Sequence, residues 1–120
     1  MSGELTPEHW ELITAVNSAY QVGEKPERDL ERTAVKSILV ALSEVAPGRS
    51  VELRIPPYAA IQVVAGHTHR RGTPSAVVET DPRTLVALAL GELTWNQAVS
   101  SGSLVASGER SDLSALFPLV

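Results

Sequence analysis

Several residue types are scarce or absent in this chain, and each absence excludes a class of site. None of the 120 residues is cysteine, which excludes disulfides, thiolate-bound metals, iron–sulfur clusters and a nucleophilic thiol. Basic residues are outnumbered, with ten Lys and Arg against fourteen Asp and Glu and a formal net charge of -4. This sign argues against nucleic acid as a partner, because affinity for nucleic acid comes largely from neutralising phosphates.

Long apolar runs and aromatic residues are also lacking. No window approaches the roughly 18 consecutive apolar residues that a membrane-spanning helix needs, and the first residues lack the basic and apolar regions of a secretory signal. We therefore expect a soluble, cytoplasmic protein with no transmembrane segment. With only two Trp, two Tyr and one Phe, the interior must be filled mainly by Val, Leu, Ile and Ala.

The chain does contain clear hydrophobic periods. Apolar residues recur at steps of three and four over residues 7–20 and 27–46, which predicts two amphipathic helices separated by a loop at 22–28. The first helix and its loop, residues 1–25, can lie at the periphery of the domain. From residue 51 the period changes to two, which predicts a strand over 51–55 that the two following prolines end.

Shorter elements follow in the second half, where glycine and proline separate short apolar runs. We expect the second strand to pair antiparallel with the first, because the turn between them is short. Asp81 before Pro82 has the form of a helix N-cap, and Thr94 with Gln97 has the capping-box spacing. The predicted elements are strands at 60–65, 76–78 and 104–107, helices at 82–90 and 95–101, and a last helical turn ending at Leu116.

This order predicts an α+β fold, in which a small, mostly antiparallel sheet is covered on one face by helices. We count four strands, and the proline-rich hairpin has room for a fifth. The connection through residues 82–102 is long enough for the last strand to join the sheet parallel to a neighbour. The length of 120 residues and the 43% hydrophobic content fit one domain spanning residues 1–120.

One segment, Gly66–Thr73 (GHTHRRGT), gathers polar residues that suit binding. His67 and His69 would share one side of a continuing strand, a spacing typical of metal ligands, but no third ligand has a fixed relation to them. Arg70 and Arg71 suit a carboxylate or a phosphate, because a guanidinium offers two parallel donors. The alternative to both sites is a solvated hairpin tip.

Patterns for catalysis are weak. Glu79 and Asp81 lie two residues apart, as a general acid and base could, but Asp81 already has a role as a helix cap. The chain has no nucleophile elbow, phosphate-binding loop, dinucleotide-binding glycine motif or zinc-protease motif. We therefore predict no catalytic residue and no cofactor. The positive signal is the helix at 82–90, which is apolar almost all round and so either is buried or lines a binding site.

The second half also carries a longer pattern: an acidic strand end, a leucine-rich helix, a short helix closing on glycine, a strand of the form Gly-x-Leu-x-x-x-Gly, and a leucine-rich C-terminal helix. The segments that carry it are Thr80–Leu85, Leu88–Leu93, Ala98–Val99, Ser101–Gly108 and Asp112–Leu113. This pattern resembles the sterol carrier protein 2 family over about residues 76–120, and more loosely over 30–120. The whole chain is similar to small stand-alone actinobacterial members of that family, through residues 47–52, 71–74 and 78–81.

The resemblance implies a sheet covered by helices, with an apolar tunnel between them that holds a fatty acyl chain, a sterol or a similar lipid. On that basis we predict a carrier without enzymatic activity, whose partner is an apolar small molecule. His69 and Arg71 would meet a polar head group at the mouth of the tunnel. The predicted ligand-binding residues are Ile61, Val63, Leu85, Leu88, Ala89, Trp95, Val99, Leu104, Leu116 and Phe117.

A second function is implied by a related domain, which forms the C-terminal part of mycothiol-dependent maleylpyruvate isomerases. Under this alternative the chain is an accessory or partner-binding domain with a filled core, and Arg71 serves an active site on another chain. A homo-oligomer or a protein partner is then expected. A void of roughly 300 Å³ or more between helices and sheet would support the carrier, and a close-packed core would support the accessory domain.

Overall fold

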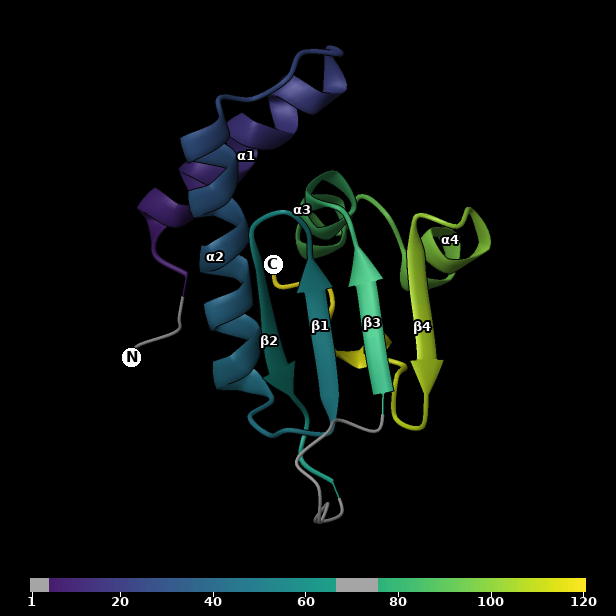
Figure 1. Cartoon of the computed structure of the whole chain (residues 1–120). Coiled ribbons are helices and arrows are strands. Elements are labelled where there is room, and N and C mark those ends of the chain that lie inside the picture. The colour runs from purple at the N-terminus through teal and green to yellow at the C-terminus, as the bar shows by residue number, and fades with distance from the viewer. Residues whose placement is uncertain (1–4, 67–75) are drawn as a thin grey trace.

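The computed structural model describes residues 5–66 and 76–120 and has the α+β architecture that the sequence predicts (Figure 1). A pair of long helices comes first, then three strands, two shorter helices, a fourth strand and a short C-terminal 3-10 turn. The elements are α1 (Pro7–Gln21), α2 (Arg28–Val45), β1 (Val51–Ile55), β2 (Ala59–Val63), β3 (Ala76–Thr80), α3 (Pro82–Leu90), α4 (Trp95–Ser100), β4 (Leu104–Gly108) and η1 (Ser114–Leu116).

The four strands form one mixed sheet in the order β2-β1-β3-β4. β1 pairs antiparallel with β2, with Leu53 opposite Ile61, which confirms the predicted hairpin. β1 pairs parallel with β3, and Val51 lies opposite Ala76. The sheet is therefore mostly antiparallel, with β1 and β3 at its centre and β2 and β4 at its edges.

The last strand does not take the parallel direction that the length of its connection allows. β4 runs antiparallel to β3, and the end of β3 at Thr80 lies opposite the start of β4 at Leu104. The reason is that α3 and α4 together carry the chain out and back to the same end of the sheet, where Thr80 Oγ1 donates to the Ser103 carbonyl (2.7 Å). A long connection thus allows a parallel return but does not require one.

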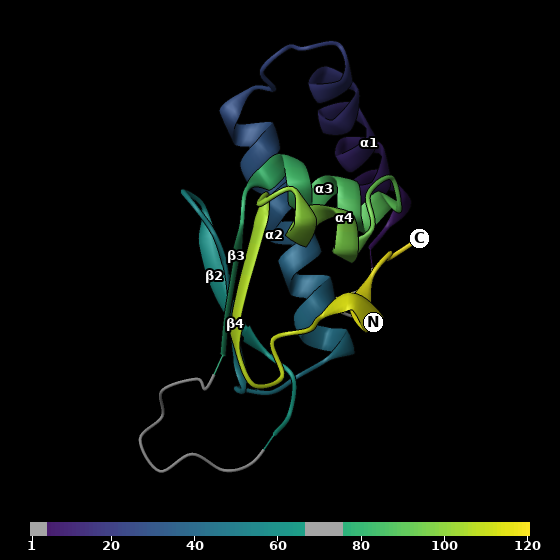
Figure 2. The same ribbon diagram turned by 90° about the vertical axis from the view of Figure 1, so that its right-hand side faces the viewer.

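All helices lie on one face of the sheet, as predicted (Figure 2). In β1, Val51, Leu53 and Ile55 are buried beneath the helices, and the residues between them face away. The opposite face carries Arg54, which donates to Glu52 Oε1 (3.2 Å) and approaches Glu79 (4.0 Å). Exposed ion pairs such as these contribute little to stability.

Local signals fix the ends of the short helices. The Asp81 side chain accepts from the backbone N–H of Thr84, so the predicted cap of α3 is confirmed. Thr94 and Gln97 form the predicted capping box at the start of α4. α3 ends at Gly91, whose φ of 78° is a left-handed conformation that glycine adopts without strain.

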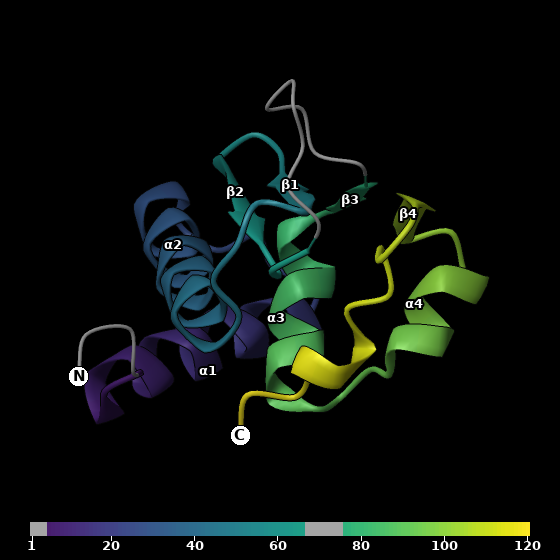
Figure 3. The same cartoon turned by 90° about the horizontal axis from the view of Figure 1, so that it is seen from below.

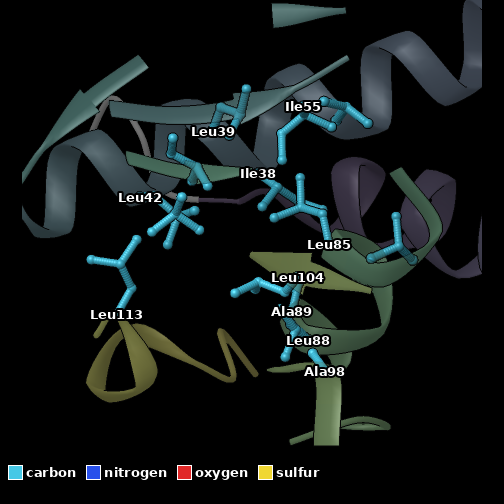
Figure 4. Close-up of a cluster of buried hydrophobic side chains, with 14 of the residues drawn as sticks. Ile38, Leu39, Leu42, Ile55, Leu85, Leu88, Ala89, Ala98, Leu104 and Leu113 are labelled. Atoms are coloured by element: carbon cyan, nitrogen blue, oxygen red, sulfur yellow. The ribbon is translucent and has the colours of Figure 1, made fainter. Parts of the chain in front are cut away.

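The core lies between the sheet and the helices, and α2 and α3 supply much of it. Figure 4 shows Leu39 and Leu42 of α2 in one cluster with Leu85 and Leu88 of α3 and Leu104 of β4. α1 packs against α2 and α3, and buries Ile13 and Val16 in the same cluster. Among residues 5–66 and 76–120, no helix combines the length and hydrophobicity needed to cross a membrane.

Candidate functional site

Half of the ten predicted ligand-binding residues lie in the packed core. Those five are between 0% and 2% exposed. A side chain beside a void wide enough for a water molecule keeps some accessible surface, so these five pack against protein on all sides. They come from β2, α3 and β4, and they are Val63, Leu85, Leu88, Ala89 and Leu104.

The other five predicted residues reach the surface. Ile61, Trp95, Leu116 and Phe117 are half-buried and pack against the edge of the core. Val99 is 44% exposed, whereas its neighbour Ala98 is buried. The residues predicted on the basis of the family resemblance therefore belong to two environments, the interior of the domain and the edge of its core.

Trp95 and Phe117 are brought together although they belong to distant parts of the chain. Their ring centroids are 6.4 Å apart, and the ring planes are inclined by 22°, which is a stacked arrangement. Figure 3 shows that the C-terminal segment passes near the connection leading into α4 before it turns across α3 toward the C-terminus. Together Trp95 and Phe117 supply the two aromatic walls of a surface groove.

We call this groove the Trp95 groove. It has a volume of about 320 Å³ and opens to the surface. Ligand sites in proteins range from about 300 to about 1,000 Å³, so the groove is large enough for a small ligand or for part of a longer one. Its lining residues are Gly91, Leu93, Thr94, Trp95, Asn96, Ser114, Phe117 and Pro118.

The C-terminal wall of the Trp95 groove is held by a few hydrogen bonds. The Leu119 N–H donates to the Ala89 carbonyl at the end of α3 (2.9 Å). The Ser114 N–H donates to Asp112 Oδ1 (2.9 Å), and this bond lowers the pKa of the Asp112 carboxyl below its ordinary value. Few hydrogen bonds hold this wall, and it is anchored by Leu113, which is 2% exposed, whereas Leu116, Phe117 and Leu119 are only half-buried against the core.

The predicted polar sites have different outcomes. His67, His69, Arg70 and Arg71 lie outside the described residues, so the proposed mouth of the tunnel stays a prediction. Asp81 accepts from Thr84 N–H (2.8 Å) and Thr84 Oγ1 (3.1 Å), which accounts for this carboxylate as a helix cap. Within residues 5–66 and 76–120, no group of three or more His, Asp and Glu side chains could hold a metal ion.

One polar cluster was missed by sequence reasoning. The Glu31 carboxylate of α2 accepts hydrogen bonds from Tyr20 of α1 and from Tyr58 after β1, the latter at 2.6 Å. Arg83 of α3 lies over the Tyr20 ring, 5.8 Å from its centroid. Because the four residues come from four separate segments, no local spacing in the sequence indicates that they meet.

Burial, and then the hydrogen bond to Glu31, raise the pKa of the Tyr20 phenol well above its ordinary value of 10.0. The folded protein therefore favours the protonated phenol, and this contribution to stability is present below about pH 10 and lost as the pH rises further. We expect the free energy of unfolding to fall above about pH 10, and to fall less steeply in the Tyr20→Phe variant. Urea unfolding at a series of alkaline pH values measures both slopes, and parallel slopes would contradict the assignment.

The comparisons with known proteins identify the family. The family described as "Bacterial SCP ortholog" matches residues 27–119, which is well over half of the chain. The matched range starts just before α2 and includes every strand, α3, α4 and nearly all of the C-terminal segment. No curated protein matches the chain. The match confirms the resemblance to sterol carrier proteins, and the chain belongs to the family of bacterial SCP orthologs.

Proposed function

We propose that this protein binds and carries an apolar small molecule, such as a fatty acyl chain or a similar lipid, and does not transform it. The observation that carries the proposal is the Trp95 groove, in which Leu93, Trp95 and Phe117 offer an apolar lining. Membership of the bacterial SCP ortholog family supports the same function. Among the described residues, the lining of the groove includes the polar Thr94, Asn96 and Ser114 but no charged side chain, which suits an alkyl group better than an ion.

The expected energetics fit an alkyl ligand. Removing apolar surface from water contributes about 25 cal/mol per Å², so covering about 200 Å² of an acyl chain contributes about 5 kcal/mol before the costs of association. A longer chain needs more room than the groove provides. We place the rest of such a chain toward Leu88 and Ala89, which are buried; the C-terminal wall would have to move, because its Leu119 N–H donates to the Ala89 carbonyl.

This placement keeps the predicted tunnel as the path of a long ligand. Leu116 and Phe117 would shift first, since they are half-buried and belong to the weakly held wall. Leu85, Leu104 and Val63 would contact only a ligand that separates α3 from the sheet. A ligand in the sheet-facing half of the tunnel would therefore require the largest movement of α3.

A second function is favoured by one observation. The five buried residues of the predicted wall are at most 2% exposed, which is the filled core expected of an accessory or partner-binding domain. Under this alternative the Trp95 groove would hold no lipid. The two functions differ in one measurable property, the affinity of the purified protein for acyl chains.

Titration with lauric acid distinguishes them. In a Trp10→Phe background, Trp95 is the sole tryptophan, and we expect its emission to shift to shorter wavelength as the alkyl chain covers the ring. Phe117→Ala should weaken binding about tenfold, the effect of losing one aromatic contact at the centre of a site. Leu30→Ala removes a leucine that is 43% exposed on α2 and serves as the control.

The same proteins are then examined by native mass spectrometry after incubation with a bacterial lipid extract. A retained lipid that is lost in Phe117→Ala supports the carrier. Unchanged Trp95 emission together with the absence of any retained species overturns it and leaves the accessory domain. Circular dichroism of each variant verifies that the fold is retained.

A further inference from the structure

A larger pocket lies at the opposite end of α3 from the Trp95 groove, and we call it the proline-tyrosine pocket. Its volume is about 560 Å³, and it is formed where the loop before α2, the turn after β1 and the start of α3 meet. Its lining residues are Lys25, Pro26, Arg28, Glu31, Pro57, Tyr58 and Pro82. The nine residues of α3 separate it from the groove by about 13 Å, at 1.5 Å per residue.

Three of the seven residues that line this pocket are prolines. Each of the three segments contributes one proline, namely Pro26, Pro57 and Pro82. A proline has a fixed φ angle, so these walls change shape little. They suit a flat apolar body better than a flexible chain.

Tyr58 is held in place by its hydroxyl group. It donates to Glu31 Oε1 at 2.6 Å, and the other oxygen of the same carboxylate accepts from the buried Tyr20. The ring that lines the pocket is thereby fixed before any ligand arrives. A preformed wall lowers the entropy cost of binding.

The charges that line the pocket favour an anion. Lys25 and Arg28 are exposed, and neither forms a salt bridge within the described part of the chain. Glu31 is the one carboxylate among the lining residues, and both of its oxygens already accept hydrogen bonds from tyrosine. Among the lining residues, two cations stand against one carboxylate, whereas Glu24, Glu27 and Asp29 of the same segment are not among them.

We propose that the proline-tyrosine pocket is a second binding site, which takes a small aromatic carboxylate. The aromatic ring packs between the prolines and Tyr58, and the carboxylate accepts hydrogen bonds from Arg28 and Lys25. A guanidinium presents paired donors that match the two oxygens of a carboxylate. The site is distinct from the Trp95 groove, because the two share no lining residue among those that the structure describes.

Sodium benzoate is the probe, and benzyl alcohol is its neutral match. Saturation-transfer NMR is expected to show benzoate bound to the full chain and to show benzyl alcohol bound more weakly. The double variant Lys25→Gln with Arg28→Gln should bind benzoate about tenfold more weakly, because charge-assisted hydrogen bonds are lost. Binding of benzyl alcohol should stay unchanged in that variant, since the apolar walls are intact.

Two further variants locate the site. Trp95→Ala should bind benzoate as the unaltered protein does, whether or not lauric acid binding is lost. Tyr58→Phe keeps the ring but releases it from Glu31, and should weaken both probes by a few fold. The proposal is overturned if benzoate does not bind, if the double variant binds it equally well, or if Trp95→Ala is the change that abolishes binding.

Discussion

Replacing Leu85 with alanine is expected to lower the free energy of unfolding by about 2 to 5 kcal/mol. Leu85 is 0% exposed and lies on α3, which packs against both α1 and α2. Removing its side chain forfeits the free energy of burial and leaves a cavity that helices held on several sides cannot fully close. Urea unfolding followed by circular dichroism measures the loss.

The size of this loss is informative because a domain has only about 5 to 15 kcal/mol of stability in total. Leu30→Ala is the matched control, since Leu30 is 43% exposed on α2 and should cost less than about 1 kcal/mol. An equal loss at the two positions would show that Leu85 is not a core residue. If lauric acid enters the predicted tunnel, it should restore part of the stability lost in Leu85→Ala, because a ligand that binds only the folded state stabilises it.

A second large effect is expected at Gly48, in the turn between α2 and β1. Its φ is 151°, and a Cβ atom placed there would lie 2.2 Å from the backbone carbonyl carbon of Val64. Val64 is held from both sides, since its N–H donates to the Ala46 carbonyl (2.8 Å) and its carbonyl accepts from Ser50 N–H (3.0 Å). Gly48→Ala must therefore break this connection or distort it, with a loss of about 3 kcal/mol or more.

Gly102→Ala distinguishes the two causes of the loss expected for Gly48→Ala, which are the unfavourable φ and the clash with the Val64 backbone. Gly102 also has a positive φ, 79°, but within the described part of the chain no atom lies within 4 Å of the position that its Cβ would take. Only the conformational penalty remains there, which is about 1 to 2 kcal/mol. Thermal and urea unfolding of the two variants measure the difference in stability. Equal losses would mean that the clash with Val64 does not contribute to the destabilisation.

Much of the fold could be predicted because it rests on local signals. The strand at 51–55 matches β1 residue for residue, since its alternation is regular and prolines follow it. The long helix predicted at 27–46 is α2, one residue shorter at each end. The strand predicted at 60–65 ends sooner, because Val64 adopts a φ of 69° that no local preference of valine indicates.

The direction of β4 and the nature of the site depend on contacts between distant residues. The length of the connection from β3 gave no information on where two short helices would return the chain. An apolar stripe marks Leu85, Leu88 and Ala89 as buried, but it has the same form whether the stripe faces a ligand or other side chains. The pairing of Trp95 with Phe117 arises from the path of the C-terminal segment, which the hydrophobic periodicity of the sequence does not predict.

The two ends of α3 contribute to different pockets. Pro82, its first residue, lines the proline-tyrosine pocket, and Gly91, directly after its last residue, lines the Trp95 groove. A helix of this length moves as a stiff rod, so a displacement at one end reaches the other. If a long ligand displaces α3, the two sites become thermodynamically linked, and each ligand changes the affinity for the other by the same factor. The protein would then respond to two chemically different molecules through the position of a single helix.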